Sequence, residues 1–290
     1  MSGAGVNDGI VGAVRDKYGK IARGEQSGCC GPSGPCGGTA ETQVALEIGY
    51  GERDLADLPD GTNLGLGCGA PIGHLDLKPG EHVLDLGSGA GIDAFIASKR
   101  VGPTGSVIGV DMTPDMLERA RRSAARGGFH NVDFREGRLE ALPVESGTID
   151  AVTSNCVINL VPDKAEVFRE AARVLKPGGR MVISDIVLDG RLPEAIEKDV
   201  YAYVGCVSGA SLRGDYFGWL RAAGFHVEVL RDVDYLASME EAAPEEARAL
   251  LERSGVGRDQ LAGKVRSLTY RATRSNSCCG PTCCAGDKRS

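Results

Sequence analysis

One short stretch constrains the fold of this chain more than any other. Val83 to Gly91 reads Val-Leu-Asp-Leu-Gly-Ser-Gly-Ala-Gly, and the mostly apolar segment Ile92 to Ala97 follows directly. Glycines in such a loop allow a sharp turn, a close approach of the backbone to a ligand, and tight packing of the next helix on the strand. A strand, a glycine turn and a helix in this order predict a nucleotide-binding loop.

Strand and helix patterns alternate from Gly80 onward, which predicts a mostly parallel sheet with crossover helices on both faces. One helix should begin at Thr113-Pro114-Asp115 and end at Gly127-Gly128; another, capped by Asp163, should be closed by Pro177-Gly178-Gly179. The expected strands are His82 to Leu86, Ser106 to Asp111, Val132 to Glu136, Ile149 to Ser154 and Arg180 to Val187, with Phe225 to Leu230 and Lys264 to Ala272 as an antiparallel pair at the sheet edge.

The flanking segments differ in composition from this central part. Helices are expected over residues 9–23 and 40–47, a loop over 24–39, and further helices over 193–204, 215–223 and 244–253. We therefore divide the chain into four parts: 1–76, N-terminal helices and a Cys-rich loop that contribute to the substrate site; 77–190, a nucleotide-binding domain; 191–273, a substrate-binding elaboration with the late strands; and 274–290, a disordered Cys-rich tail.

Charge and hydropathy narrow the class of protein. The formal net charge of −7 argues against a general nucleic-acid binder, which would normally be basic. No stretch approaches the roughly 18 consecutive apolar residues that a membrane span needs, and Met1 to Asp8 lacks the charged and apolar regions of a signal peptide. We expect a cytoplasmic protein without nucleic-acid or membrane partners, and a monomer.

Two acidic residues indicate what the glycine loop binds. Asp85 precedes the first glycine by two residues, so its carboxylate should lie beside the loop, where it suits ammonium and sulfonium charges better than a pyrophosphate. This favours S-adenosylmethionine over a dinucleotide, as does the spacing Gly87-x-Gly89-x-Gly91 in place of G-x-G-x-x-G. Asp111, 22 residues after Gly89, can accept both hydrogen bonds of a ribose diol. The alternative is that Asp111 merely caps the following helix.

These signals occur in order with Glu136 to Pro143, Ile149 to Ser154 and Leu175-Lys176-Pro177-Gly178-Gly179. From about Leu77 to Leu188 the chain thus resembles the class I S-adenosylmethionine-dependent methyltransferases, which implies their Rossmann-like α/β fold and that cofactor. By this resemblance Arg138 and Leu139 lie beside adenine, although many members carry an acidic residue where this chain has Arg138. The implied cofactor-binding residues are Asp85, Gly87, Ser88, Gly89, Asp111, Met112, Arg138, Leu139 and Asn155.

Three of the ten cysteines stand alone in ordered-looking sequence: Cys68, Cys156 and Cys206. Taken singly, each could be a small buried hydrophobe; taken together, they indicate a soft thiolate site. Their contexts, Gly-Leu-Gly-Cys-Gly, Ser-Asn-Cys-Val-Ile-Asn-Leu and Val-Gly-Cys-Val-Ser-Gly-Ala, resemble motifs of the arsenite methyltransferases from about Tyr18 to Ala210. The resemblance implies that these three thiolates bind As(III), delivered as arsenite or its thiol conjugates, and that methylated arsenicals are made for detoxification.

The chemistry agrees with these residue types. Trivalent arsenic is thiophilic, and its lone pair can attack the sulfonium methyl directly, so that no general base is required. Because methylation formally oxidises arsenic, a trivalent product needs electrons, which a cysteine disulfide could supply if thioredoxin or glutathione later reduced it. The arsenite methyltransferases that the chain resembles also tend to carry a cysteine in the N-terminal region. Cys36 is our candidate for that catalytic thiol, with Cys29 and Cys30 as alternatives.

Other readings stay open. Cys278, Cys279, Cys283 and Cys284 could capture arsenite or form a dispensable tail, and all four lie within seven residues, too compact for the usual structural zinc site. A methyltransferase for another small molecule would share the cofactor motifs without needing three cysteines. A non-enzymatic metalloid sensor or sequestering protein would need the thiols without a working cofactor site.

Overall fold

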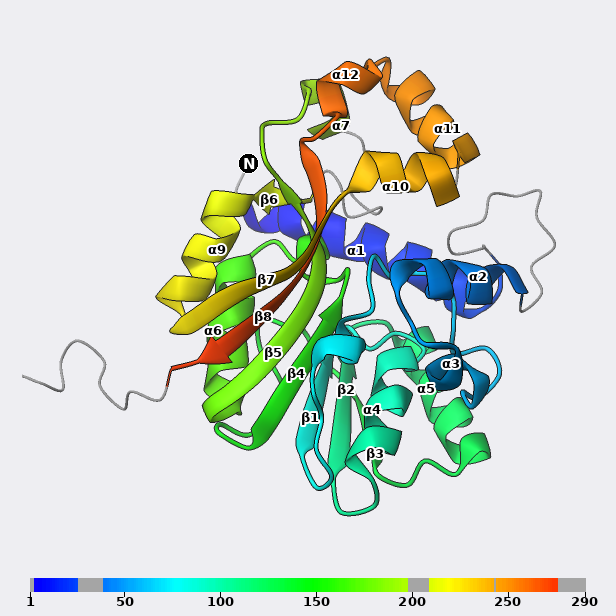
Figure 1. Ribbon diagram of the computed structural model, residues 1–290, viewed down its shortest axis with the longest axis vertical. Coiled ribbons are helices and arrows are strands. Elements are labelled where there is room, and N and C mark those ends of the chain that lie inside the picture. The colour runs from blue at the N-terminus through cyan, green and yellow to red at the C-terminus, as the bar shows by residue number, and fades with distance from the viewer. Residues whose placement is uncertain (1–2, 26–38, 198–208, 243, 276–290) are drawn as a thin grey trace, which may run out of the picture.

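The computed structural model describes residues 3–25, 39–197, 209–242 and 244–275, and a single sheet runs through its centre (Figure 1). The strands are β1 His82–Leu86, β2 Ser106–Asp111, β3 Val132–Glu136, β4 Ile149–Asn155, β5 Leu175–Leu188, β6 Ser211–Leu212, β7 Phe225–Asp234 and β8 Val265–Arg274. The helices are α1 Gly3–Ala22, α2 Thr39–Ile48, α3 Glu52–Ala56, η1 Pro71–His74, α4 Ile92–Val101, α5 Pro114–Gly127, η2 Ile158–Leu160, α6 Lys164–Val174, α7 Glu194–Glu197, α9 Arg213–Ala222, α10 Tyr235–Ala242, α11 Pro244–Ser254 and α12 Arg258–Leu261.

The strand order is β3-β2-β1-β4-β5-β8-β7, with β6 paired to β5. The pairs from β3 to β5 are parallel, whereas β8 runs antiparallel to both β5 and β7. The predicted Rossmann-like α/β fold is confirmed, including the antiparallel pair at the edge. The chain order reverses at β1, whose neighbours are β2 and β4, and ligands of open α/β sheets bind at such a point.

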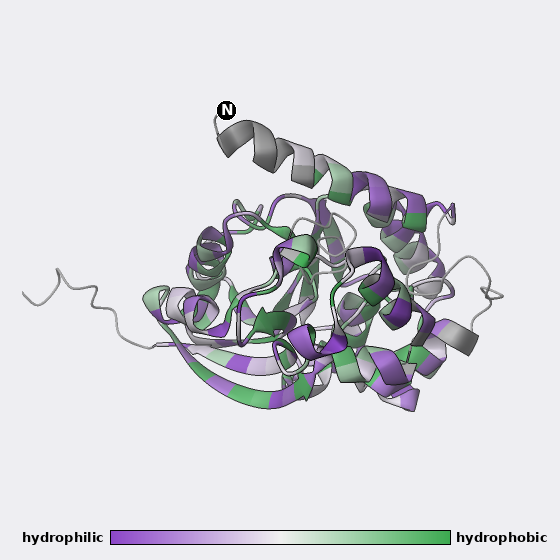
Figure 2. Ribbon diagram, turned by 90° about the horizontal axis from the view of Figure 1, so that it is seen from above, coloured by the Kyte–Doolittle hydropathy of each residue, from purple (hydrophilic) through white to green (hydrophobic). Residues whose placement is uncertain are grey.

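Alternating side chains of the central strands divide the core into two layers. Val83 packs with α4 and α5 residues, whereas the next residue, Leu84, packs with α6 and α9 residues on the other face. Val182 and Ile183 repeat the alternation on β5. Each fully buried aliphatic side chain of this kind contributes about 1.5–3 kcal/mol. Figure 2 shows green, apolar segments in the central strands and many purple, hydrophilic residues in the surrounding helices.

Helix α1 crosses the carboxyl ends of the parallel strands (Figure 1). Its Val14 is buried in an apolar cluster with Leu160 and Ile186, and Ile21 is buried against Met116 of α5. Arg119 also donates to the carbonyl of Ala22 at 2.9 Å. The helix was expected only from residue 9, but it begins at Gly3. These contacts place its middle turns above the point where the chain order reverses.

The start of α6 was predicted correctly, but its end was not. Glu166 N–H donates to Asp163 at 3.0 Å, so the predicted cap of α6 is confirmed. That helix ends at Val174, however, and β5 already begins at Leu175. The segment Pro177 to Gly179, expected to separate helix from strand, is part of β5 because the β4–β5 register shifts between Ile149 and Ala151 and absorbs it.

The first residue of the predicted C-terminal tail belongs to a strand. Arg274 still belongs to β8, and Ser275 N–H donates to Gly224 O at 3.0 Å, so the tail predicted from residue 274 is tied to the sheet at its first two positions. The predicted loop at 26–38, the end of the predicted helix at 198–204 and the tail from 276 lie outside the described residues. None of the helices within the described ranges is long and apolar enough to cross a membrane.

A buried carboxyl joins β5 to η2 and α9. Asp185 accepts hydrogen bonds from Asn159 Nδ2 at 2.8 Å, from Ile186 N–H at 3.0 Å and from Tyr216 O–H at 2.9 Å, while Tyr270 O–H donates to Tyr216 at 3.2 Å. Burial raises the pKa of Asp185 to about 7, although these hydrogen bonds favour the ionised form. Asp185 therefore stays protonated in the folded protein up to about pH 7, whereas in an unfolded chain it loses its proton near pH 4.

We expect the free energy of unfolding to fall as pH rises from about 4 to about 7 through Asp185, because unfolding releases its proton in that window. Asp185→Asn removes this pH-dependent contribution to the free energy of unfolding. In urea unfolding, the variant should therefore lose less stability than the wild type between pH 5 and pH 7.5. Asp133→Asn, at an exposed carboxylate on β3, is the control. Parallel pH curves for wild type and Asp185→Asn would contradict the assignment.

Candidate active site

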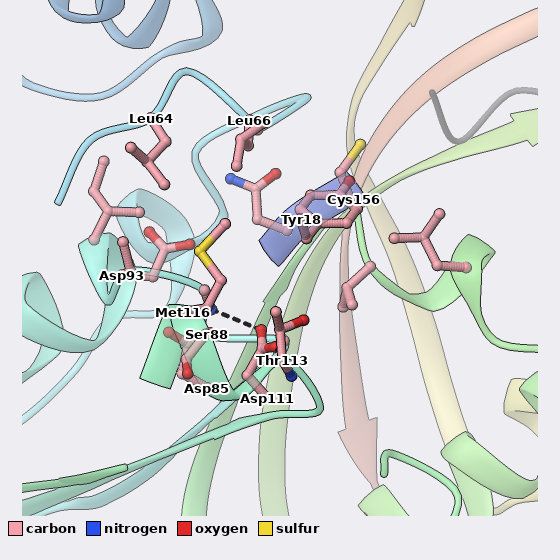
Figure 3. Close-up of a pocket in the computed structure, with 18 of the residues that line it drawn as sticks. Tyr18, Leu64, Leu66, Asp85, Ser88, Asp93, Asp111, Thr113, Met116 and Cys156 are labelled. Atoms are coloured by element: carbon pink, nitrogen blue, oxygen red, sulfur yellow. Dashed lines mark hydrogen bonds between the residues drawn. The ribbon is translucent and has the colours of Figure 1, made fainter. Parts of the chain in front are cut away.

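A cavity opens where β1, β2, β3 and β4 end, below α1 (Figure 3). It holds about 1190 Å³ of empty space, counting the part open to solvent, which is ample for a nucleoside-sized ligand. Leu64 and Leu66 lie on the side opposite Asp111 and Thr113, and Cys156 lies at one flank (Figure 3). The lining therefore combines apolar walls with acidic residues at the strand ends.

The three loop glycines have different roles. Gly87 has φ +68°, and a Cβ there would lie 2.4 Å from Val157 Cγ2. Gly91 has φ +96°, and a Cβ would lie 2.7 Å from the ring of Phe95. Gly89 has φ +50°, yet a Cβ would meet no atom within 4 Å, because this residue faces the cavity. Two glycines thus permit close packing, and the third keeps space open for a ligand.

Asp111 connects the loop to the next helix. One carboxylate oxygen accepts from Gly89 N–H at 2.9 Å, and the other accepts from Thr113 N–H at 2.8 Å, just before Pro114 begins α5. Asp111 therefore fixes the glycine loop and the residue before α5, whereas the N-cap position of that helix is Thr113 and not Asp111. The Thr113 hydroxyl and Met112 N–H also favour the ionised form of this carboxyl, whose two oxygens offer about four lone-pair sites in all. Burial raises the pKa of Asp111, opposed by these N–H donors.

Two further carboxyls lie deeper in the same lining. Asp85 and Asp93 are only 2% and 3% exposed, and Tyr50 O–H donates to Asp93 Oδ1 at 2.9 Å. Burial raises the pKa of Asp85 well above its usual range, and the negative charges of Asp93 and Asp111 add to this. Burial likewise raises the pKa of Asp93 to about 7, although the Tyr50 hydrogen bond favours its ionised form. The cavity therefore has a strong preference for positive charge.

Two buried polar atoms of this lining are unpartnered. Asp85 Oδ2 and Ser88 Oγ find no hydrogen-bond partner among the described residues, although both side chains are buried. Leaving such groups unpaired costs about 1–3 kcal/mol each, more for a charged group. A ligand that donates to them would recover that cost. Donor groups such as an ammonium or a hydroxyl meet this requirement.

The other residues expected to bind the cofactor all line the cavity. Met112 and Leu139 contribute apolar surface, and Arg138 pairs with Glu140 at 2.8 Å while remaining half exposed. Asn155 also lines the cavity, but its amide is engaged by the protein: Oδ1 accepts from Cys68 N–H, and Nδ2 donates to Tyr50 and Gly69. The geometry of this amide therefore does not favour direct contact with the cofactor.

Two of the three isolated cysteines meet at the edge of the cavity. Cys68 and Cys156 form a disulfide with their Cα atoms 5.8 Å apart, although 88 residues separate them in sequence. Cys156 lines the cavity, and its backbone is held by a hydrogen bond from its N–H to Ser184 O at 2.8 Å. The other cysteines lie outside the described residues: Cys29, Cys30, Cys36, Cys206, Cys278, Cys279, Cys283 and Cys284.

Sequence reasoning missed several lining residues, above all Asp93, Tyr50, Tyr18 and Met116. An acidic residue in the first turn of a helix is common because it interacts favourably with the helix dipole, so Asp93 gave no distinctive signal. Tyr50 lies in a region with no recognisable motif. Its position depends on long-range packing beside η1, which local patterns do not encode.

The comparisons with known proteins agree with this geometry. Residues 77–243 match the family described as Methyltransferase domain, which is more than half of the chain. The chain belongs to the methyltransferase domain family. The match begins just before β1 and extends to the end of α10, so it contains the glycine loop, Asp111, Asn155 and Cys156.

Curated relatives and solved structures add detail. The chain is 45% identical over 220 residues to an arsenite methyltransferase from Halobacterium salinarum, covering 73% of this chain and 56% of that protein. It is 42% identical over 154 residues to a human arsenite methyltransferase, covering 50% and 40%. The matched part thus spans about half the length of these relatives. A crystal structure of an arsenic(III) S-adenosylmethionine methyltransferase from Chlamydomonas reinhardtii aligns with TM-score 0.56 and 32% identity, covering 81% of this chain and 74% of that one.

The two glycines of the loop give a paired test. Gly87→Ala should lower the free energy of unfolding by several kcal/mol, because its Cβ overlaps Val157 and its φ is positive. Gly89→Ala should cost only about 1 kcal/mol from its positive φ, while its methyl group enters the ligand space and weakens nucleoside binding.

Urea unfolding and calorimetric titration with S-adenosylhomocysteine measure the two effects separately. Equal affinity of wild type and Gly89→Ala for this nucleoside would show that the ligand does not lie over Gly89.

Proposed function

We propose that this chain transfers methyl groups from S-adenosylmethionine to trivalent arsenic bound by cysteine thiolates. The observation that carries the proposal is the meeting of Cys68 and Cys156 at the edge of an acidic, nucleoside-sized cavity in a methyltransferase domain. The names of the relatives from Halobacterium salinarum and Chlamydomonas reinhardtii support arsenite as the acceptor. The sequence motifs around both cysteines agree with this acceptor.

The cavity fits S-adenosylmethionine by its own chemistry. Asp111 is available to the ribose hydroxyls, Gly89 leaves room beside the loop, and Asp85 Oδ2 and Ser88 Oγ need donors. Burial is the main cause of the raised pKa values of Asp85 and Asp93, and an ammonium and a sulfonium in the cavity would favour the ionised form of both carboxyls. When bound, S-adenosylmethionine supplies an electrophilic methyl group on a positively charged sulfur.

The protein's contribution is to hold the acceptor in place. Arsenite exchanges its hydroxyl or thiol substituents for the thiolates of Cys68, Cys156 and Cys206, and each exchange releases water or a thiol. The arsenic lone pair then forms the As–C bond as the C–S bond breaks, which leaves a neutral thioether. A general base is not needed, because the attacking atom carries no proton. Fixing the two reacting atoms in line is worth orders of magnitude in rate.

The electrons balance through thiols. Methyl transfer raises arsenic by two oxidation units, and returning it to the trivalent state takes two electrons, which two thiols supply as they form one disulfide. Cys68 and Cys156 are close enough to form such a disulfide. Thioredoxin or glutathione would restore the thiols, and Cys36, Cys29 or Cys30 would be the further cysteine donor. Cytoplasmic placement, a monomeric state and the boundaries of the four chain segments stay predictions.

The decisive assay combines the protein with arsenite, labelled S-adenosylmethionine and a thiol reductant. We expect labelled methyl arsenicals, and at least about a 100-fold loss of rate for Cys68→Ser, Cys156→Ser or Cys206→Ser, because each removes an arsenic ligand. Binding of S-adenosylhomocysteine by the same variants is the control for folding, and it should change little.

Other outcomes identify the rival functions. The chain is 36% identical over 147 residues to a demethylmenaquinone methyltransferase from Lactococcus lactis, so labelled quinol without labelled arsenical would replace arsenite with an organic acceptor. Arsenite binding without any affinity for S-adenosylhomocysteine would indicate a sequestering protein. Undiminished arsenite methylation by Cys206→Ser would remove that cysteine from the site.

Affinity for S-adenosylmethionine should rise with pH between about 6 and 8. The pKa of Asp93 is raised to about 7, so the site gains negative charge across this range. The comparison uses wild type and Asp93→Asn, because the ligand's own ionisation is common to both and cancels. Asp133→Asn is a control at an exposed position. Identical pH dependence of the dissociation constant in wild type and Asp93→Asn would contradict this role.

A further inference from the structure

The side-chain amide of Asn155 holds the loop that carries Cys68. Its Oδ1 accepts from Cys68 N–H at 3.1 Å, and its Nδ2 donates to Gly69 O at 2.6 Å. The amide orientation follows from these partners, since the carbonyl must face an N–H and the amino group must face a carbonyl. One residue therefore fixes the backbone at and directly after Cys68, while its own chain neighbour is Cys156.

The same amide reaches the donor pocket. Asn155 Nδ2 also donates to Tyr50 Oη at 3.0 Å, and Tyr50 donates its one hydroxyl proton to Asp93 Oδ1 at 2.9 Å. Burial and the charge of Asp93 raise the pKa of Tyr50 well above its usual range, so the hydroxyl stays protonated and donates. A continuous hydrogen-bonded chain thus runs from Cys68 to the acidic lining beside the glycine loop.

The Cys68 loop has little freedom around this chain. A Cβ on Gly67 would lie 2.7 Å from Asn155 Nδ2, and a Cβ on Gly69 would lie 2.5 Å from Ser184 Oγ. Ser267 Oγ also donates to Cys68 O at 2.9 Å. The loop is therefore packed against Asn155 on one side and against β5 and β8 on the other. A shift of Asn155 has to move Cys68 relative to Cys156.

We propose that Asn155 is a positioning residue that couples the donor pocket to the cysteine pair, with Tyr50 as the connecting group. Occupation of the nucleoside pocket holds Asp93 and Tyr50 in place, and Asn155 then holds Cys68 beside Cys156. Pocket occupation and the Cys68–Cys156 bond favour each other. The inference rests on the proposed function only in taking a nucleoside donor as the ligand of the pocket, and arsenic is not needed to test it.

The coupling can be measured in two ways. The ligand shifts the thiol–disulfide equilibrium by some factor, and disulfide formation must change the affinity for the ligand by the same factor. In a glutathione buffer, the thiols of Cys68 and Cys156 lose two protons and two electrons to form the disulfide. Oxidised glutathione accepts both and becomes two reduced glutathione molecules. The equilibrium constant of this exchange is the observable.

The experiment equilibrates the full chain in glutathione buffers of graded ratio, with and without saturating S-adenosylhomocysteine. Free thiols are then blocked with N-ethylmaleimide. Mass spectrometry quantifies the peptide pair joined through Cys68 and Cys156 separately from any pair that the other cysteines form. We expect the ligand to increase the equilibrium constant for this disulfide by at least about fivefold. The disulfide form should bind the ligand more tightly by the same factor.

Three variants separate coupling from general stability. Tyr50→Phe keeps the buried ring but removes the hydroxyl that joins Asn155 to Asp93, so the coupling factor should fall towards one. Asn155→Asp places a carboxylate against Gly69 O and should also abolish the coupling. Asn131→Asp is the matched control, because Asn131 Nδ2 likewise donates to a backbone carbonyl, Gly102 O at 2.9 Å, but at the α4–β2 connection. It should lower stability and leave the coupling factor unchanged.

Each outcome has a distinct meaning. A coupling factor near one in the wild type, or the same factor in wild type and Tyr50→Phe, would overturn the inference even if arsenite is methylated. Absence of S-adenosylhomocysteine binding by the folded wild type would instead overturn the proposed donor site. If Tyr50→Phe fails to fold, as circular dichroism would reveal, Asn155→Asp supplies the comparison.

Discussion

The pairing of β1 with β2 on one side and β4 on the other is the constraint on which the site depends. Because the chain order reverses there, no crossover helix covers the carboxyl end of β1, and a cavity can form above it. Gly87 and Gly91 then allow the turn to pack closely on Val157 and Phe95. The packing of α1 across the same end completes the cavity walls.

The acidic lining of the cavity lowers the stability of the ligand-free protein and favours ligand binding. Asp85 and Asp93 are almost completely buried, and the raised pKa of each reports how poorly the protein alone solvates their charge. A core built only for stability would not place acidic groups so close together. Under the proposed function, the same arrangement favours S-adenosylmethionine over S-adenosylhomocysteine, because both carry an ammonium but only the methyl donor adds a sulfonium charge.

The sequence was sufficient for the parts of the fold that local patterns determine. The first three strands were predicted to the residue, because each combines β-branched or apolar alternation with a flanking glycine or proline. The boundary between α6 and β5 was predicted in the wrong place. A shift in strand register depends on the partner strand and gives no signal in the local sequence. Tyr50 was missed because its position depends on long-range packing beside η1. The adjacency of Cys68 and Cys156 followed from a resemblance, and only the folded chain gives it a geometry.

The single hydrogen of the Tyr50 hydroxyl gives the chain of bonds from Cys68 to the donor pocket a direction. Asn155 Nδ2 can only donate, so Tyr50 must accept from it and can give its own hydrogen to Asp93 alone. A proton on that oxygen of Asp93 would leave two hydrogens facing each other and force the hydroxyl to turn away. The backbone beside Cys68 is thus sensitive to where one proton lies on a carboxyl it never touches.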